Sequence, residues 1–167
     1  MADQSVRGKM GESSAIPDPR AQTMALQGLA NRVVRGMLRT PLLSSAMGSK
    51  LVTLYIVGRK SGRRYTIPVA YTKDKDDLLI GTPFGWGRNL RTGEPVEILL
   101  KGRRRQADVL VYQDEADVVG AYATMCRDNK QFAGFNKIGF DAKGNPDPEE
   151  LHLAWMAGAR AFRLTPR

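Results

Sequence analysis

The chain has little cysteine and little histidine: one of each among 167 residues, Cys126 and His152. A single cysteine cannot form a disulfide within the chain, which favours a reducing compartment. A transition-metal site built from the usual sulfur and imidazole ligands is nearly excluded, and we expect no metal. A Ser-His-Asp site would have to recruit His152 from the C-terminal region, and no nucleophile-elbow motif accompanies it.

Long hydrophobic runs are also missing. No stretch approaches the roughly 20 apolar residues of a membrane span, and the opening MADQSVRGKMGESS lacks the apolar core of a signal peptide. We therefore expect a cytoplasmic protein. Its length favours one domain with a hydrophobic core of its own.

Acidic residues are in the minority. Lys and Arg number 26 against 17 Asp and Glu, which gives a net charge of +9. Such a balance suits an anionic partner: nucleic acid, a membrane surface, or a phosphorylated or carboxylated small molecule. Aromatic residues make up only 7% of the chain, fewer than a nucleic-acid surface with interleaved aromatic side chains requires, so we expect no specific nucleic-acid partner.

The N-terminal part divides into two segments. Residues 1–18 are polar and rich in glycine, which predicts a flexible tail. In 21–39, apolar residues recur near helical spacing while Arg32, Arg35 and Arg39 line another face, which predicts a basic amphipathic helix. This helix either packs on the domain or associates peripherally with an anionic membrane. The remainder of 19–167 is expected to form one domain with it.

From Leu51 the pattern changes to strands. The short β-branched or aromatic runs are 51–57, 64–72, 77–82, 95–100, 106–112 and, at the C-terminus, 159–166. Turn-forming clusters separate them, among them 73–77 and KGRRR at 101–105, where Gly102 suits a tight turn. Closely spaced strands with few intervening helices predict an antiparallel barrel or sandwich and disfavour a doubly wound sheet.

Helical patterns fill the region between Tyr112 and the last strand. Asp114 is suited to cap a helix, a second short helix is expected from Gln131 to Ile138, and a third begins at Pro148 after the loop 139–148. The predicted fold class is therefore α+β and mainly β, with peripheral helices.

The first stretch that could carry chemistry is GRKSG, 58–62. Its two glycines allow a sharp turn that exposes backbone N–H groups, and Arg59, Lys60 and Ser61 add donors for a phosphate or carboxylate. The spacing of a Walker loop is absent, so ATP or GTP hydrolysis is not indicated. By itself such a turn is also compatible with a solvated hairpin tip.

Two further stretches remain open. GTPFGWGRNLRTG, 81–93, is too apolar for an ordinary connection: it either supports a flat ring or plugs the end of the barrel with Phe84 and Trp86. KGRRR, with Arg91 nearby, is either a nucleic-acid patch or a charged hairpin tip that protects sheet edges.

In this order the motifs are more specific than any of them alone. A strand leading into GRKSG, a strand containing Pro68, then LLIGTPFGWGRNL and PVEILLKGRRRQADV resemble the deazaflavin-dependent nitroreductase family. The resemblance covers roughly 51–111. It implies a split β-barrel of the antiparallel type shared with FMN-binding, pyridoxamine phosphate oxidase-like proteins.

The resemblance further implies an oxidoreductase in which the reduced deazaflavin coenzyme F420 gives a hydride to a nitro compound, quinone or enone. That cofactor carries a phosphodiester and a polyglutamate tail. By analogy Arg59, Lys60 and Ser61 would hold the phosphate and tail, and Trp86 and Asn89 the far wall. The ring would be bordered by Ile67, Pro68, Val69, Ile80, Gly81, Thr82 and Pro83.

The chain departs from the family in several places. Tyr65 stands where members commonly have a basic residue, three positions before the proline, and the segment before W-x-x-N-L is shorter than in nitroimidazole-reducing members. Catalytic residues are not matched, and Tyr71 and Tyr122 are candidates only. The alternatives are FMN on the same barrel, or a non-catalytic protein that binds the cofactor. A homodimer is a further expectation.

Overall fold

The computed structural model describes residues 50–167. The expected tail 1–18 and the expected amphipathic helix 21–39 lie outside the described residues. The described strands are β1 (Leu51–Val57), β2 (Arg64–Ala70), β3 (Thr72–Asp74), β4 (Asp77–Thr82), β5 (Val96–Leu100), β6 (Arg103–Tyr112) and β7 (Arg160–Pro166). The helices are the 3-10 helix η1 (Gly85–Asn89) and the α-helices α3 (Glu115–Asp128), α4 (Lys130–Phe135) and α5 (Pro148–Met156).

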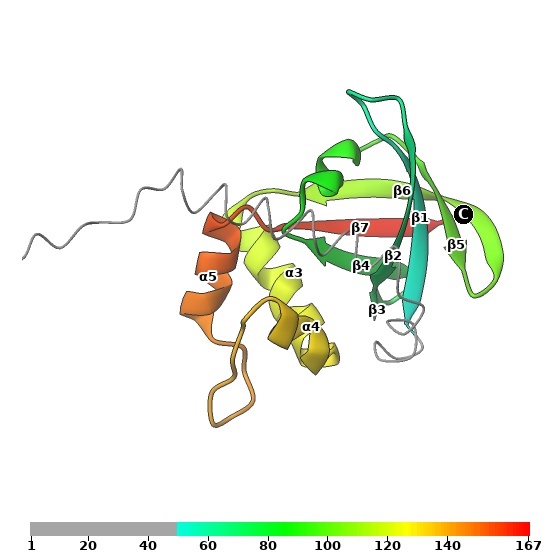
Figure 1. Ribbon diagram of the computed structural model, residues 1–167. Coiled ribbons are helices and arrows are strands. Elements are labelled where there is room, and N and C mark those ends of the chain that lie inside the picture. Colours follow the sequence, from blue (N-terminus) through cyan, green and yellow to red (C-terminus); the bar gives the residue numbers. More distant parts are fainter. Residues whose placement is uncertain (1–49) are drawn as a thin grey trace, which may run out of the picture. The chain divides into compact units, whose positions relative to one another are not determined.

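The seven strands form one antiparallel sheet in the order β2-β1-β5-β6-β7-β4-β3 (Figure 1). β2 and β3 lie at opposite ends of this order, yet only Tyr71 separates them along the chain. The sheet must therefore curl until its two ends meet at Tyr71. The predicted antiparallel, mainly β, split-barrel fold with peripheral helices is confirmed.

The ends of the sheet meet over a short distance only. β3 pairs with β4 from Thr72↔Leu79 to Asp74↔Asp77, whereas β2 pairs with β1 alone. Within the described chain, the outer edge of β2 and the edge of β4 beyond Leu79 have no strand partner. These two free edges are the split in the barrel.

Alternation along the strands divides the apolar residues between two cores. The barrel interior is built from residues such as Leu54, Ile80, Ile98 and Phe162, all with no exposed surface. The outer face of β4 and β7 is covered by α3, which also packs against α4 and α5. This second core contains Leu79 and Ala161 from the sheet and the buried faces of the helices; Figure 1 shows the helices gathered on that side.

Most predicted boundaries are met within two residues; the second helix, α4, ends at Phe135, three residues before the predicted Ile138, and two strand predictions also differ. The run 64–72 is broken at Tyr71, where the chain passes from one end of the sheet to the other. β6 begins at Arg103, so the arginines of KGRRR are strand residues and the turn is only Lys101 and Gly102. Both turn residues have positive φ, 49° and 76°, as a type I′ hairpin requires.

The helix starts follow from capping. Asp147 accepts hydrogen bonds from the N–H groups of Glu149 and Glu150, and Pro148 occupies the first turn of α5. Asp114 is the N-cap of α3, although its side chain makes no capping hydrogen bond. Within residues 50–167 no helix has the length and apolarity needed to cross a membrane.

Candidate functional site

The β1–β2 turn, 58–63, is shaped by its own backbone. Gly58 N–H donates to the Arg63 carbonyl at 2.8 Å, and Gly62 N–H donates to the Gly58 carbonyl at 2.7 Å. Gly62 has φ of 65°, which favours glycine. A Cβ on Gly58 would lie 2.6 Å from Ser61 Oγ and 2.8 Å from the Tyr65 ring, so the turn closes over that glycine.

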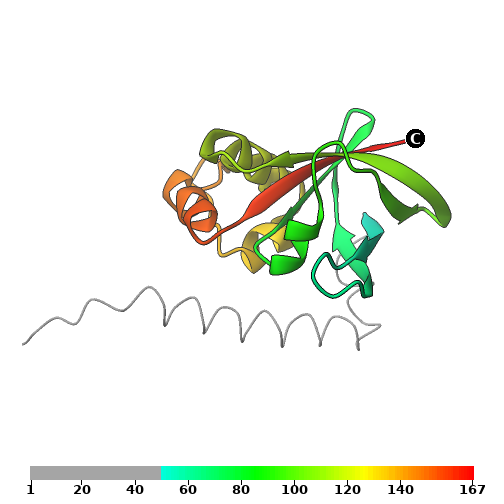
Figure 2. The same ribbon diagram turned by 90° about the horizontal axis from the view of Figure 1, so that it is seen from above.

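Asn89 ties this turn to η1. Its Oδ1 accepts a hydrogen bond from Arg59 N–H at 3.1 Å, across 30 residues of chain, and its Nδ2 donates to the Trp86 carbonyl at 2.9 Å. Figures 1 and 2 both show the turn beside η1. The GRKSG motif and the W-x-x-N motif therefore lie together at one end of the barrel.

The loop after β4 is packed onto the barrel. Thr82 is buried and its Oγ1 accepts a hydrogen bond from Phe84 N–H at 3.0 Å. Gly87 lies so close to Thr82 and Phe162 that a Cβ would meet them at 2.8 and 3.0 Å. Trp86 stacks on Phe162 with ring centroids 6.4 Å apart and an interplanar angle of 21°. Trp86 therefore packs against the barrel core, as the plug interpretation expected of it, whereas Phe84 packs edge-on against Phe135 of α4 at 5.9 Å.

The register of β2 separates its side chains by face. Tyr65, Ile67 and Val69 stand opposite the buried residues of β1 and therefore share the barrel-facing side. Ile67 and Val69 are half-buried against the barrel core. Arg64 and Pro68 face the other way and are exposed.

The backbone of β2 alternates as well. Gly58 N–H to the Arg63 carbonyl and Tyr71 N–H to the Lys50 carbonyl fix which opposing pairs exchange hydrogen bonds. Pro68, opposite Thr53, falls on a pair that exchanges none, so its missing N–H leaves no gap in the ladder. The carbonyl of Pro68 and both backbone polar groups of Thr66 consequently point to the free edge.

On the β4 side of the split, the expected residues are more enclosed. Ile80 has no exposed surface and belongs to the barrel core. A Cβ on Gly81 would meet Met125, Phe132 and Tyr122, each at 2.9 Å, so the side-chain position of Gly81 faces the helices. Pro83 is exposed at the start of the loop.

The structure therefore brings part of the predicted set together at one end of the barrel, whereas Ile80 and the side-chain position of Gly81 lie within the two cores. The turn (Arg59, Lys60, Ser61) joins η1 (Trp86, Asn89) through Asn89, and the free edges contribute the residues around Pro68 and Thr82. Ile67 and Val69 offer side chains to this region, whereas the free backbone groups come from Thr66 and Pro68. Their roles toward a cofactor stay predictions.

The two candidate catalytic tyrosines lie in different cores. Tyr71 is buried among the barrel residues, and Tyr122 is buried beneath the helices on the other face of the sheet. Tyr122 Oη has no hydrogen-bond partner among the described residues, and burial raises the pKa of this phenol. The ring of Tyr122 packs edge-on against Phe132 at 5.2 Å.

Sequence reasoning gave no site role to Tyr65 or Thr66. Tyr65 Oη lies 3.2 Å from Ser61 Oγ, within the same turn. Alternation through Tyr65, Ile67 and Val69 was the signal available for placing Tyr65 on the barrel-facing side. Thr66 could be found only from the pairing partner of β2, which the sequence does not specify.

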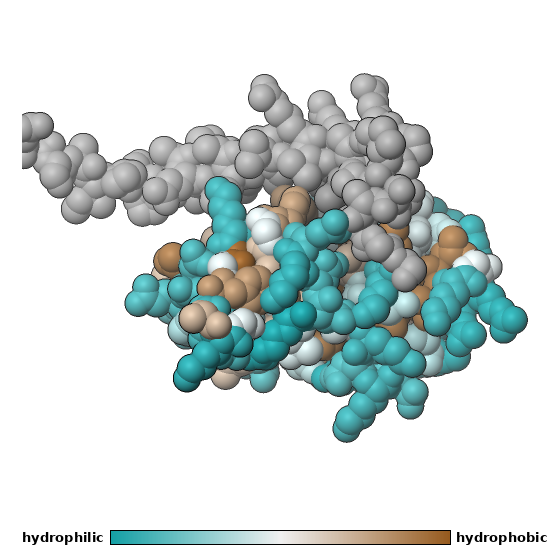
Figure 3. Space-filling view, turned by 90° about the horizontal axis from the view of Figure 1, so that it is seen from below, coloured by the Kyte–Doolittle hydropathy of each residue, from teal (hydrophilic) through white to brown (hydrophobic). Residues whose placement is uncertain are grey.

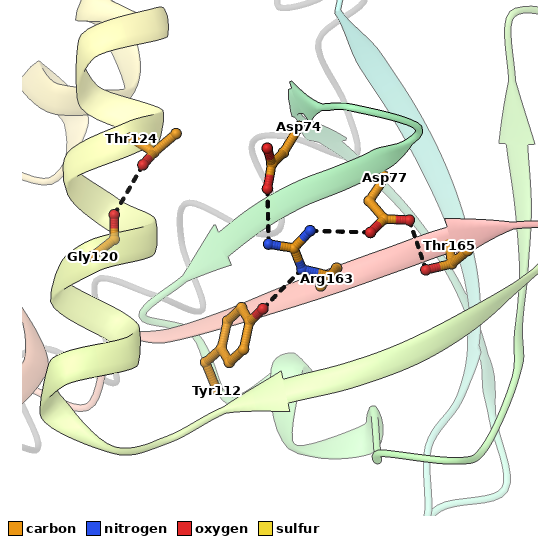
Figure 4. Close-up of polar contacts among 7 residues, drawn as sticks. All are labelled: Asp74, Asp77, Tyr112, Gly120, Thr124, Arg163 and Thr165. Carbon is orange, nitrogen blue, oxygen red and sulfur yellow. Dashed lines mark hydrogen bonds and ion pairs between the residues drawn. The ribbon is translucent and has the colours of Figure 1, made fainter.

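The charges at this end differ from those on the outer wall of the barrel. Among residues 50–167, the side chains of Lys60, Arg63, Arg64 and Arg88 make no ion pair with a carboxylate. Arg163 on β7, by contrast, contacts Asp74 at 2.8 Å, Asp77 at 3.0 Å and the Tyr112 hydroxyl at 2.8 Å (Figure 4). Within the described part of the chain these four cations are thus not used in ion pairs, whereas Arg163 is held by three partners of the fold.

Figure 3 shows hydrophilic side chains over most of the visible part of the described chain, with apolar side chains between them.

In the described residues no group of three or more His, Cys, Asp and Glu side chains is placed to hold a metal ion. Cys126 is buried, which raises the pKa of its thiol to about 11.

No family model matches this chain, and no curated protein matches it. Among solved structures it is similar to a conserved hypothetical protein of Mycobacterium tuberculosis, with 12% identity, 77% of this chain and 81% of that chain covered, and a TM-score of 0.48. A pyridoxamine 5'-phosphate oxidase-related, FMN-binding protein of Nostoc punctiforme has 15% identity, 91% and 83% coverage, and a TM-score of 0.47. HutZ, the heme storage protein of Vibrio cholerae, has 14% identity, 76% and 89% coverage, and a TM-score of 0.39. At these identities and scores the likeness bears on neither ligand nor reaction.

Proposed function

We propose that this protein is an F420-dependent oxidoreductase that passes a hydride from the reduced deazaflavin to a small electrophilic acceptor such as a nitro compound, quinone or enone. The observation that carries the proposal is the hydrogen bond from Arg59 N–H to Asn89 Oδ1. It holds a turn rich in anion donors against an apolar loop at the split of the barrel. A tailed, ring-bearing cofactor would need an anion-binding surface and an apolar surface side by side, and this hydrogen bond supports such an arrangement.

The donor set of the turn fits a phosphate. Ser61 offers a hydroxyl, Lys60 an exposed ammonium group, and the turn is closed so tightly that Gly58 has no room for a side chain. Charge-assisted hydrogen bonds from such groups are among the stronger ones in proteins. Arg59 and Lys60 would hold the phosphate and the acidic tail, and Ser61 would orient the phosphate.

The split supplies the surface for the ring. Ile67 and Val69 present apolar side chains from β2, and the carbonyl of Pro68 faces the free edge. Trp86 and Asn89 close the region from η1. These groups would exclude water from one side of the ring and fix its orientation, while the bound deazaflavin itself supplies the hydride chemistry.

FMN is the second candidate cofactor on the same barrel. Arg59, Lys60 and Arg63 place three cations within five residues of the turn, which also suits the doubly charged phosphomonoester of FMN. A third possibility, a protein that binds the cofactor without catalysis, is favoured by the enclosure of Tyr71 and Tyr122 in packed cores.

Fluorescence titration of the purified protein with F420 and with FMN tests the proposal. We expect F420 to bind at micromolar concentration or tighter, and Lys60→Ala to weaken it by about 1–3 kcal/mol, the scale of a charge-assisted hydrogen bond. Lys101→Ala in the β5–β6 turn is the matched control and should bind like the parent. A folded parent protein that binds no F420 overturns the proposal; tighter binding of FMN replaces it with the second candidate.

Catalysis is tested separately with reduced F420 and a panel of nitro compounds, quinones and enones. Oxidation of the cofactor that depends on both protein and acceptor supports an enzyme. Tight binding without turnover across the panel supports the non-catalytic alternative.

A further inference from the structure

Ser61 and Tyr65 form a pair of hydroxyl groups at the base of the β1–β2 turn. Their oxygens lie 3.2 Å apart, and Ser61 Oγ also accepts a hydrogen bond from Arg63 N–H at 3.3 Å. The Tyr65 ring packs over Gly58, where a Cβ would lie 2.8 Å from it. The tyrosine is therefore held by the backbone of the turn as well as by its hydroxyl.

The position of Tyr65 on β2 directs it to the candidate site. It shares the barrel-facing side with Ile67 and Val69, while the neighbouring Arg64 faces the opposite side. Tyr65 is 39% exposed although its ring packs over Gly58, so the side chain is open to solvent in part. The group that borders the turn on the side of the ring-binding residues is thus neutral, and the nearest strand cation points away.

The hydrogen bond between Ser61 and Tyr65 leaves one hydroxyl hydrogen free to donate to another group. Two hydroxyl groups carry two hydrogens, and the bond between them uses one. If Tyr65 donates to Ser61, the Ser61 hydrogen is free; if Ser61 donates to Tyr65, the Tyr65 hydrogen is free. In either arrangement the free O–H belongs to a hydroxyl group whose oxygen accepts a hydrogen bond, which strengthens it as a donor.

We propose that the Ser61–Tyr65 pair is a neutral donor site for the phosphate group of the cofactor and that Tyr65 selects a singly charged phosphodiester over a doubly charged phosphomonoester. The inference rests on the proposed function, because it assigns a specificity to the same site. One hydrogen bond without a charge satisfies an oxygen of a phosphodiester, whereas a phosphomonoester dianion gains more from a cation at this position. Tyr65 is a positioning and specificity residue and takes no part in hydride transfer.

The test compares dissociation constants for F420, a phosphodiester, and FMN, a phosphomonoester, in the parent protein and in Tyr65→Phe, Tyr65→Lys, Ser61→Ala and the Ser61→Ala/Tyr65→Phe double variant. We expect Tyr65→Phe to weaken F420 binding about three- to tenfold, the range for a neutral hydrogen bond. The double variant should lose more affinity than the sum of the two single losses, because each single variant still keeps one O–H that is free to donate and the double variant keeps none. Tyr65→Lys should move the F420-to-FMN preference towards FMN by about tenfold or more.

Tyr55→Phe is the control, since Tyr55 lies on the outer wall beneath Arg104 and should leave both constants unchanged. Urea unfolding of each variant establishes that it is folded; if Tyr65→Lys is not, Tyr65→Phe and the double variant still decide. Equal F420 affinity for parent and Tyr65→Phe, additive effects in the double variant, or an unchanged preference in a folded Tyr65→Lys protein each overturns the inference while the proposed function stands. A folded parent that binds neither cofactor overturns both.

Discussion

The β1–β2 turn and the β5–β6 turn both join antiparallel strands through glycine and several cations, and they are held in different ways. The β5–β6 turn is two residues long, and β6 begins at once with Arg103. Of the arginines that follow, Arg104 is used on the outer wall, 2.8 Å from Glu97 and over the Tyr55 ring. The β1–β2 turn is longer and is bonded to Asn89, 30 residues away.

The difference shows why charge and glycine alone do not identify a binding turn. In a two-residue hairpin both residues are fixed by the twist of the strands, and the neighbouring side chains are divided between the two faces of the sheet. A longer turn that is bonded to another loop keeps several donors on one side. We therefore expect changes in the β1–β2 turn to alter ligand affinity and changes in the β5–β6 turn to alter stability alone.

Glycine replacement separates the two turns most strongly. Gly58→Ala would force a Cβ against Ser61 and Tyr65, and we expect it to cost about 1–3 kcal/mol of unfolding free energy, as overpacking does. It should also weaken cofactor binding by at least the loss seen for Tyr65→Phe. A Cβ on Gly102 would meet open space, so Gly102→Ala is unfavourable only because of the positive φ of this residue. We expect it to lower the unfolding free energy by about 1–2 kcal/mol and to leave the affinity for the cofactor unchanged.

Urea unfolding and fluorescence titration on the same preparations measure both effects. A Gly58→Ala protein with the affinity of the parent would show that the turn need not keep this shape to bind. Loss of affinity in Gly102→Ala would erase the distinction between the two turns.

The ion-pair network on the outer wall gives a second contrast, because it should affect stability and not binding. The Thr165 hydroxyl donates to Asp77 at 2.7 Å and Arg163 contacts it at 3.0 Å, and both lower the pKa of this carboxyl group. Asp77→Asn should destabilise the protein at neutral pH by about 1–2 kcal/mol, somewhat below the usual loss for a hydrogen bond to a charged group because the site is partly exposed. F420 affinity should not change.

The pH dependence of this effect follows from the direction of the shift. A carboxyl group with a lowered pKa in the folded state stabilises the protein above its unfolded pKa of about 3.9, and the stabilisation is lost as the pH falls through the folded value. The difference between parent and Asp77→Asn should therefore be full at pH 6–7 and shrink below about pH 4. Urea unfolding across this range measures it, and a difference that is constant with pH would mean that the charge of Asp77 contributes nothing.

Asn89→Ala tests the link between the β1–β2 turn and η1. Removal of the acceptor of Arg59 N–H should cost about 1 kcal/mol in cofactor affinity, the net worth of a typical hydrogen bond, with a smaller change in stability because the group is partly exposed. Asn129→Ala is the matched control: it removes an asparagine that caps α4 and should lower stability without changing affinity. If both variants bind F420 like the parent, the turn does not depend on η1.

Much of the fold could be predicted from the sequence because the strands carry their own signal. Short runs of apolar and β-branched residues bounded by turn signals define β1, β4 and β7, and Gly102 marks the tight turn. The break at Tyr71 was missed because 64–72 is uniformly strand-like, and only the closure of the sheet forces the chain to change neighbours there. Alternation alone does not tell which strands meet across a barrel.

The residues of the candidate site could be predicted from the sequence more readily than their arrangement in space. GRKSG and W-x-x-N were both recognisable, but the bond between Arg59 and Asn89 is a long-range contact with no local pattern. The placement of Tyr122 beneath the helices depends on which face of β4 the helix α3 covers, which the helical periodicity does not specify. The backbone N–H and carbonyl groups of Thr66 point to the free edge because β1 occupies the other edge of β2.

The smallest expected effects come from the β5–β6 hairpin. Arg103 and Arg105 are exposed strand residues that make no ion pair with a carboxylate among residues 50–167. Replacing either with alanine should change stability by no more than about 0.5 kcal/mol and leave the F420 dissociation constant unchanged. Arg63→Ala, an equal loss of charge at the other turn, should weaken binding measurably at low salt and less at high salt, since exposed charges are screened. Titrations at two salt concentrations distinguish two explanations. If the anionic cofactor is attracted generally to a basic protein, all three variants lose affinity equally. If the β1–β2 turn recognises the cofactor, only Arg63→Ala loses affinity.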